Sequence, residues 1–229
     1  MPVLQVHDIE MAYAERGDGP TVVALHAATS NGSEMGWLAH IIAHEGFNVV
    51  TPDLRGHGAT PNPAPDLHLP RLADDMLEFI YLLGRTPLHA AGFSLGGAVM
   101  LNAARQRPEL FRSLVLMGTS YCAPTPERVR KVIGPEDART VQQKAIFDRQ
   151  AGAVVGWQIP PDALEVVICP VLIITADRDE YYEPEDSLTL YRSLPNAEVL
   201  IVPRSDHVGL VRHPLVVQAV RDFYARVPR

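Results

Sequence analysis

The sequence predicts an α/β fold, in which a mostly parallel sheet is covered by helices on both faces. Three observations carry this prediction. Short aliphatic runs alternate with helical patterns along the chain, and most of these runs are apolar on both faces, as strands between two helix layers must be. The chain has 229 residues, of which 47% are hydrophobic and 21% charged, and this length suits one domain with one core.

The strands and helices are expected in a regular order. The first fifteen residues alternate apolar and polar side chains and predict a hairpin, followed by a polar turn at residues 15–20. Apolar runs predict further strands, each apolar on both faces, at Thr21–His26, Phe47–Pro52, Pro87–Phe93, Ser113–Thr119, Val171–Ala176 and Glu198–Val202. Helical spacing fills the gaps at Glu34–His44, Leu72–Leu83, Leu95–Gln106, Pro184–Ser193 and Leu215–Arg226.

The alternation of strands and helices breaks once, between residues 121 and 169. Most of this stretch is polar and charged, although it contains Phe147 and Trp157. A connection too long for a simple loop is usually a functional insertion. We therefore expect residues 121–169 to form a small cap over the strand ends, and residues 1–120 and 170–229 to form the core domain.

Charge and hydropathy argue against several classes of partner. Twenty Lys and Arg residues stand against 27 Asp and Glu residues, for a net charge of −7, which argues against a protein that binds nucleic acid or anionic membranes. The longest apolar stretch, Val166–Ala176, is broken by Pro170 and is too short to cross a membrane, so a buried strand is expected there. We expect a partner that is a small neutral molecule.

The compartment follows from the N-terminus and the cysteines. The N-terminus has no basic region leading into an apolar one, so no secretory signal is predicted. Cys122 and Cys169 are isolated from each other and have no metal-ligand spacing, which is typical of free thiols in a reducing compartment. We therefore expect a cytoplasmic protein, either a monomer or a homodimer.

The clearest chemical signal is the segment Gly92-Phe93-Ser94-Leu95-Gly96-Gly97, where an apolar strand ends and an amphipathic helix begins. A G-x-S-x-G turn in this context holds its serine in a strained conformation, and glycines two residues before and after it avoid a collision. Ser94 is then a candidate nucleophile at a helix N-terminus, and the N–H of Leu95 is a candidate oxyanion donor. A phosphate-binding loop would need the Lys-Ser/Thr that this segment lacks.

A serine nucleophile needs an imidazole to take its proton and a carboxylate to orient that imidazole. Both follow in the chain. The strand ending at Ala176 leads into Asp177-Arg178-Asp179-Glu180, and the next strand leads into Pro203-Arg204-Ser205-Asp206-His207. His207 is the candidate base, and one of the acidic residues after Ala176 is the candidate acid. His213, which precedes Pro214, is expected to mark the start of the last helix.

At these residues the chain resembles the α/β-hydrolase superfamily over nearly its whole length, with residues 121–169 matching least. Four motifs agree in order. His26-Ala27-Ala28 is similar to the family's His-Gly-x oxyanion loop, Asp53-Leu54-Arg55-Gly56-His57-Gly58 to its Asp-x-Arg-Gly-x-Gly loop, Gly92–Gly96 to its nucleophile elbow, and Ala176–Asp179 to the Gly-x-x-Asp that carries its acid. Ala27 and Ala176 replace two of the family's glycines.

The resemblance implies an α/β-hydrolase fold, and we expect a hydrolase that needs no cofactor. It implies Asp179 as the acid, His207 as the catalytic imidazole and the N–H of Ala28 as the second oxyanion donor. Arg55 and His57 are expected to order the glycine-rich turn. Candidate pocket residues lie in or beside these motifs and the cap: His26, Phe93, Tyr121, Phe147, Trp157, Tyr181 and Tyr182.

We therefore expect a serine hydrolase that cleaves small to medium carboxylic esters through an acyl-enzyme. The same side chains serve lactone and enol-lactone hydrolysis, C–C bond hydrolysis and cofactor-free perhydrolysis, so these stay open. A ligand sensor of hydrolase fold with little turnover is the alternative of another class. His40 and His44 have a metal-ligand spacing on one helix, but no third ligand accompanies them, so no metal is expected.

Overall fold

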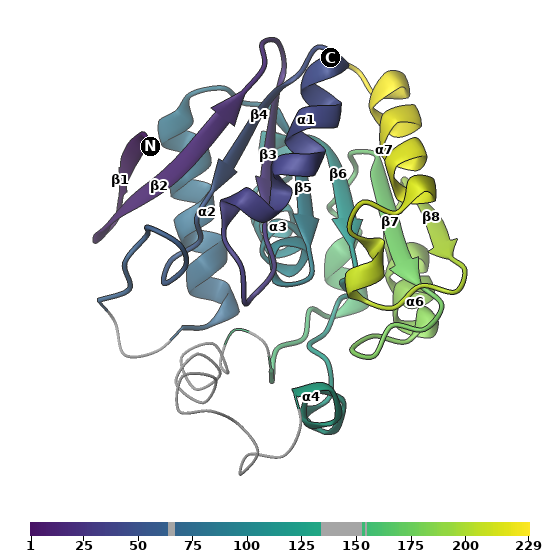
Figure 1. Cartoon of the computed structure of the whole chain (residues 1–229). Coiled ribbons are helices and arrows are strands. Elements are labelled where there is room, and N and C mark those ends of the chain that lie inside the picture. The colour runs from purple at the N-terminus through teal and green to yellow at the C-terminus, as the bar shows by residue number, and fades with distance from the viewer. Residues whose placement is uncertain (64–66, 134–152, 154) are drawn as a thin grey trace.

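The computed structural model describes residues 1–63, 67–133, 153 and 155–229. Its centre is an eight-stranded sheet with the strand order β1-β2-β4-β3-β5-β6-β7-β8 (Figure 1). The strands are β1 (Val3–Val6), β2 (Ile9–Arg16), β3 (Thr21–Leu25), β4 (Asn48–Pro52), β5 (Leu88–Phe93), β6 (Phe111–Met117), β7 (Val171–Ala176) and β8 (Ala197–Val202). β1 pairs with β2, and β2 with β4, in antiparallel fashion, whereas all strands from β4 to β8 are parallel.

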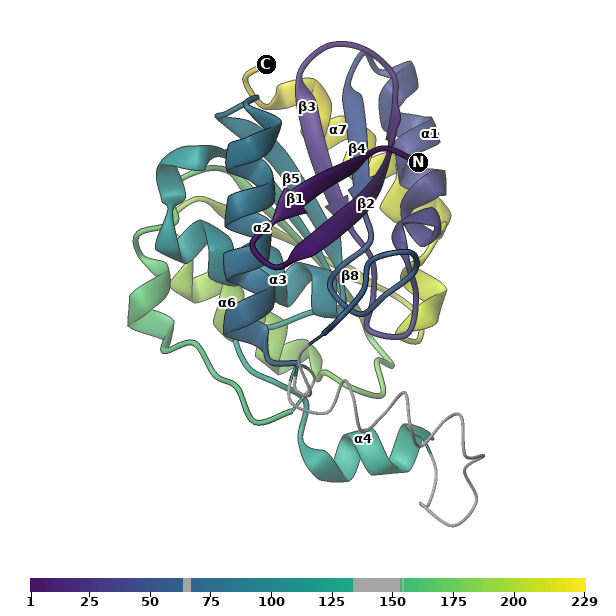
Figure 2. The same ribbon diagram turned by 90° about the vertical axis from the view of Figure 1, so that its left-hand side faces the viewer.

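Helices cover both faces of this sheet (Figure 2). One face carries α1 (Gly36–His44) and α7 (Pro214–Arg226), and the other carries α2 (Leu69–Leu83), α3 (Leu95–Gln106) and α6 (Pro184–Ser193). Two buried apolar clusters follow this division, one between the sheet and each helix layer. Successive side chains of β5 point to opposite faces of the sheet, since Ala90 packs into one cluster and Ala91 into the other. The expected α/β class, with helices on both faces, is therefore confirmed.

Most element bounds agree with the sequence prediction to within a few residues. β7, α3 and α6 have the predicted limits. α2 begins earlier than predicted, at Leu69, because the side chain of His68 caps it by accepting the Arg71 N–H at 3.3 Å. The predicted helix from Glu34 splits into a 3-10 turn at Gly32–Met35 followed by α1.

Two predictions about strands are wrong. β8 is not buried on both faces, because it forms the edge of the sheet: its first residues are half-buried and Ile201 is 39% exposed. The apolar stretch from Val166 is a buried strand only from Val171 onwards, and Val166 and Ile168 are exposed. Burial thus follows sheet position, which hydropathy alone does not record.

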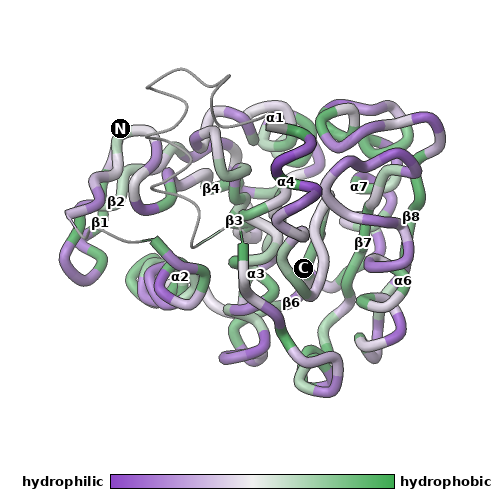
Figure 3. The backbone as a smooth tube through the Cα atoms, turned by 90° about the horizontal axis from the view of Figure 1, so that it is seen from below, coloured by the Kyte–Doolittle hydropathy of each residue, from purple (hydrophilic) through white to green (hydrophobic). Residues whose placement is uncertain are grey.

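Helix α2 is amphipathic. Hydrophilic and hydrophobic residues alternate around α2 (Figure 3), and its buried side includes Leu72, Met76 and Phe79. Within the described ranges, no helix is both long enough and apolar enough to span a membrane.

The stretch between β6 and β7, where we expect a cap, leaves the sheet at the carboxyl ends of the strands (Figure 1). Its two ends pair, because the Ala123 N–H donates to Trp157 O at 2.9 Å and the Ile159 N–H to Tyr121 O at 2.8 Å. Between them lies α4 (Pro126–Ile133). Arg128 of α4 forms an ion pair with Glu183 at the start of α6, so the stretch is also joined to the core by charge.

Candidate active site

Ser94 occupies the sharp turn between β5 and α3. Its φ of 54° and ψ of −116° place a non-glycine residue in a strained region of backbone space. The turn is held at both sides, since the Ser94 N–H donates to Met117 O at 2.8 Å and Ser94 O accepts from the Ala98 N–H at 3.1 Å. The side chain stands at the N-terminus of α3, where free N–H groups and the helix dipole favour negative charge.

Two glycines permit this turn. A Cβ on Gly92 would lie 2.4 Å from both the carbonyl carbon and the oxygen of Gly96, and a Cβ on Gly96 would lie 2.5 Å from Leu25 O. Real Cβ atoms do not approach backbone so closely. The two glycines therefore permit the close approach of β5, α3 and β3. The predicted collision is the one between positions 92 and 96, and the contact of position 96 with β3 was not predicted.

His207 follows β8, and its imidazole hydrogen-bonds to Asp179, which follows β7. Nδ1 of His207 lies 2.7 Å from Oδ2 of Asp179, and both side chains are buried. The other carboxylate oxygen of Asp179 accepts the N–H groups of Tyr181 and Tyr182 at 2.9 and 3.0 Å. This carboxylate is thus fixed in place, and its bond to Nδ1 leaves Nε2 of His207 to act elsewhere.

The other acidic residues near His207 do not reach its ring. Asp177 accepts the Ser205 N–H at 3.1 Å and is exposed. Asp206 accepts the Gly209 N–H at 2.7 Å, and Glu180 accepts the backbone N–H of His207 at 3.1 Å. Of the acidic residues that the sequence offers as partners of the imidazole, Asp179 is therefore the one whose carboxylate contacts the ring.

Aromatic rings surround the imidazole. The ring centroids of Phe93, Tyr181 and Tyr182 lie 5.0, 4.8 and 6.2 Å from that of His207. Because Phe93 directly precedes Ser94, its contact brings the imidazole next to the turn that carries the serine. Gly118, directly after β6, leaves room for this contact: a Cβ there would lie 3.0 Å from Phe93 Cε2 and 3.1 Å from His207 Cε1. Sequence reasoning did not identify Gly118.

The loop after β3 presents the backbone at Ala27 and Ala28. The Ala27 N–H donates to Oε2 of Glu34 at 2.8 Å. Ala27 O accepts a hydrogen bond from Nδ1 of His26 at 2.7 Å. The C=O of Ala27 and the N–H of Ala28 belong to the same peptide group, and in a trans peptide they point to opposite sides. The N–H of Ala28 is therefore directed away from His26, with its orientation set by that bond.

His26 is not a pocket residue, which corrects one of the expected lining positions. Its side chain is completely buried, and its Nε2 accepts the Leu54 N–H at 3.0 Å, which leaves the proton on Nδ1. Burial lowers the pKa of His26 to about 4, with the nearby His57 acting in the same direction, so the ring is neutral. The ring orders the loop through these bonds and is not exposed to a pocket.

The loop after β4 supports the loop after β3. Nε2 of His57 lies 2.7 Å from Ala28 O, and Nδ1 lies 2.9 Å from Arg55 O. Arg55 is completely buried and hydrogen-bonds through two nitrogens to Asp75, and it also bonds to Asp8. Arg55 and His57 thus order this turn, as predicted.

The remaining expected pocket residues divide into three groups. Phe93 and Tyr182 are 3% and 4% exposed, so they contact the imidazole from within the core, whereas Tyr181 is half-buried beside it. Tyr121 and Trp157 are partly buried and pack against the core cluster that includes α2 and α3. Phe147 lies outside the described residues.

His40 and His44 lie side by side on α1, with ring centroids 4.6 Å apart, and both are exposed. Among the residues that the structure describes, no group of three or more His, Cys, Asp or Glu side chains is arranged to hold a metal ion. The pair therefore has no third ligand there.

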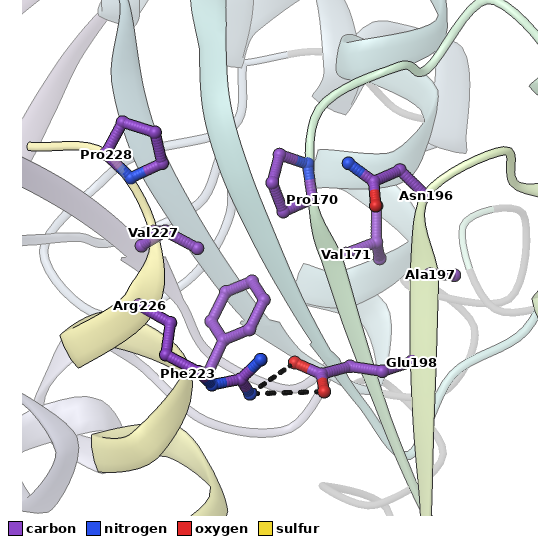
Figure 4. A pocket seen from close by; sticks show the side chains of 9 residues that line it. All are labelled: Pro170, Val171, Asn196, Ala197, Glu198, Phe223, Arg226, Val227 and Pro228. Carbon is purple, nitrogen blue, oxygen red and sulfur yellow. Dashed lines mark hydrogen bonds and ion pairs between the residues drawn. The ribbon is translucent and has the colours of Figure 1, made fainter.

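A separate hollow of about 260 Å³ lies at the opposite end of the sheet (Figure 4). It is formed where β7 and β8 begin and α7 ends, whereas Asp179 and His207 follow the strand ends. Arg226 and Glu198 form an ion pair within it, at 2.8 Å. The lining residues are Pro170, Val171, Asn196, Ala197, Glu198, Phe223, Arg226, Val227 and Pro228. This hollow has no part in the arrangement around Ser94.

Known proteins share the family and the fold of this chain. The family model described as alpha/beta hydrolase fold matches residues 20–134, half of the chain. The sn-1-specific diacylglycerol lipase ABHD11 of Mus musculus is 24% identical over 82% of this chain and 75% of its own length. The 2-(acetamidomethylene)succinate hydrolase of Mesorhizobium japonicum is 24% identical over 94% and 91%. The crystal structure of the enol-lactonase from Burkholderia xenovorans LB400 superposes with a TM-score of 0.85 at 17% identity, covering 98% and 100%, and shows the same fold.

Proposed function

Because the chain belongs to the α/β-hydrolase family, we propose that it is a serine hydrolase that cleaves carboxylic esters of small to medium size. The observation that carries the proposal is the 2.7 Å contact between His207 Nδ1 and Asp179 Oδ2, combined with the strained turn at Ser94. Relatives named as a lipase and as a succinate-derivative hydrolase support hydrolytic chemistry in general.

In the proposed mechanism, Ser94 Oγ attacks the ester carbonyl while Nε2 of His207 takes its proton. Asp179 keeps the imidazole in the required tautomer and stabilises the imidazolium that forms. The N–H groups of Leu95 and Ala28 bind the oxyanion. His207 then donates its proton to the leaving alcohol, and a water molecule, activated by the same imidazole, releases the acid from the acyl-enzyme.

The test uses p-nitrophenyl acetate and butyrate with the wild-type protein, Ser94→Ala, and Ser193→Ala at the end of α6 as a matched control. We expect steady turnover in the wild type and in Ser193→Ala, and none above background in Ser94→Ala. A fluorophosphonate should label the wild type and fail to label Ser94→Ala. Failure of the wild type to react with the fluorophosphonate would overturn the proposal.

The substrate class is tested by a panel of esters of increasing acyl length, beside lactones and β-diketones. Esters should show the highest kcat/KM. If lactones were preferred, the proposed roles of the residues would stand and only the substrate class would change, because the same nucleophile, base and oxyanion donors serve both reactions. A single stoichiometric burst without turnover would instead indicate a ligand sensor.

A further inference from the structure

We infer that Glu180 is a positioning residue for His207: its carboxylate fixes the main chain of the histidine while Asp179 fixes the ring. The inference rests on the proposed function. It concerns two segments, the acid loop (residues 177–183) after β7 and the histidine loop (residues 203–207) after β8.

Hydrogen bonds join the two loops beyond the point where the strands end. The β7–β8 pairing runs to Ala176 and Val202, and the next contact is from the Asp177 N–H to Val202 O at 3.1 Å. The Arg178 N–H then donates to Ser205 O at 3.0 Å, and the Ser205 N–H donates back to Oδ1 of Asp177. Hydrogen bonds from the backbone of the histidine loop also lower the pKa of Asp177, which favours its charged form as the acceptor.

The contact between Glu180 and His207 completes this series. Oε2 of Glu180 accepts the His207 N–H at 3.1 Å. His207 is only 5% exposed, so its N–H needs a partner within the protein. The glutamate carboxylate supplies that partner, and a hydrogen bond to an ionised acceptor is stronger than one to a neutral acceptor.

The histidine loop depends on this support because it follows the edge strand of the sheet. Among the residues that the structure describes, no strand pairs with the outer side of β8. Arg204 has a left-handed φ of 58°, and Val208, directly after the histidine, is 70% exposed. The described contacts that hold the loop main chain therefore come largely from the acid loop.

Glu180 and Asp179 act on His207 from two directions. The main-chain bond to Glu180 sets where the Cα of His207 lies, and the Nδ1 bond to Asp179 sets how the ring turns. Together they determine where Nε2 points relative to Ser94. A displacement of about 1 Å in a reacting group lowers a rate by about 10²-fold, so loss of the main-chain bond should lower kcat even with the Asp179 bond intact.

The test compares Glu180→Ala, Glu180→Gln and Glu165→Ala, a control at an exposed glutamate before β7. We expect Glu180→Ala to lower kcat for p-nitrophenyl butyrate, and the rate of fluorophosphonate labelling, by about 10- to 100-fold with KM within about 2-fold. Glu180→Gln should retain most of the rate, because its amide oxygen still accepts the His207 N–H. Glu165→Ala should match the wild type.

Hydrogen exchange of the peptide containing residues 203–208 gives a readout that does not depend on turnover. Exchange at this peptide should be faster in Glu180→Ala than in Glu180→Gln or the wild type. Equal rates and equal exchange in Glu180→Ala and Glu165→Ala would overturn the inference, as would a Glu180→Gln variant as slow as Glu180→Ala. If fluorophosphonate failed to label the wild type while Glu180 still protected the peptide from exchange, the proposed function would be overturned. The main-chain contact between Glu180 and His207 would remain established.

Discussion

Nε2 of His57 lies 2.7 Å from the carbonyl oxygen of Ala28, so the loop after β4 holds the loop that presents the proposed oxyanion donor. His57 is itself tied to the carbonyl of Arg55, and the Arg55 side chain is anchored by the buried carboxylate of Asp75. The Ala28 carbonyl is thus linked, through His57 and the main chain, to the buried ion pair of Arg55 and Asp75.

Replacing His57 with alanine should weaken the proposed oxyanion site. Loss of the bond to Ala28 O frees the loop, and removal of one oxyanion donor lowers kcat by about 10²- to 10³-fold, so a loosened donor should lower it by about 10-fold. KM for p-nitrophenyl butyrate should change little, because the interaction strengthens only in the transition state. His44→Ala, at an exposed position on α1, is the control. An unchanged kcat in His57→Ala would show that the loop holds its conformation without the imidazole.

Replacing Asp179 with asparagine should lower kcat by up to about 10⁴-fold, because the imidazole loses both its tautomeric preference and its charge stabilisation. Asp177→Asn is the matched comparison. Its amide oxygen still accepts the Ser205 N–H, so kcat should stay within a few-fold of the wild type. Steady-state kinetics on p-nitrophenyl butyrate distinguishes the two variants. A larger loss of kcat in Asp177→Asn than in Asp179→Asn would show that Asp177, and not Asp179, is the acid.

The spacing of residues along the chain does not distinguish these two aspartates. Both stand after the same apolar strand, and nothing in their spacing tells which one faces the imidazole. That choice is made by the turn after β7, where the N–H groups of Tyr181 and Tyr182 hold the Asp179 carboxylate toward His207. Family resemblance favoured Asp179, and the geometry agrees with that choice, while its catalytic role stays a prediction.

Local sequence patterns predicted the strands and helices better than they predicted the residues that hold the active-site loops in place. β7 and α6 have the predicted bounds because Pro170 and Pro184 mark their starts in the sequence itself. The exposure of β8 was not predicted, because it depends on which strand lies at the sheet edge. Gly118 and Glu34 were also missed, since each acts through a contact that forms only when separate segments of the chain fold together.

Replacing Gly92 with alanine should strongly destabilise the fold. The added Cβ would lie 2.4 Å from the backbone of Gly96, and neither backbone segment can move without disturbing the turn at Ser94. We expect a loss of about 3 kcal/mol or more in the free energy of unfolding, at the upper end for overpacking. Gly36→Ala is the control, because a Cβ there meets nothing within 4 Å. Urea unfolding measures both, and a Gly92→Ala variant within about 1 kcal/mol of the wild type would show that the turn tolerates a side chain.

Stability should fall with pH below neutrality because of His89. This residue of β5 is completely buried. Burial, with a smaller contribution from Arg112, lowers its pKa from 6.5 to about 4. The unfolded chain therefore takes up a proton at a higher pH than the folded protein does. The stabilisation is present above about pH 6.5 and is lost as the pH falls toward 4, at about 1.4 kcal/mol per pH unit.

The free energy of unfolding in urea is measured for the wild type and His89→Gln at steps between pH 7.5 and 4. The difference between the two isolates the contribution of His89 from those of other groups, including His26, whose pKa is also lowered to about 4. The wild type should lose stability faster than His89→Gln below about pH 6.5, whereas His44→Gln, at an exposed histidine, should follow the wild type. Parallel curves for the wild type and His89→Gln would mean that His89 gains its proton in the folded state as readily as in the unfolded chain. That result would require water to reach Nε2, the ring nitrogen for which the described residues provide no hydrogen-bond partner.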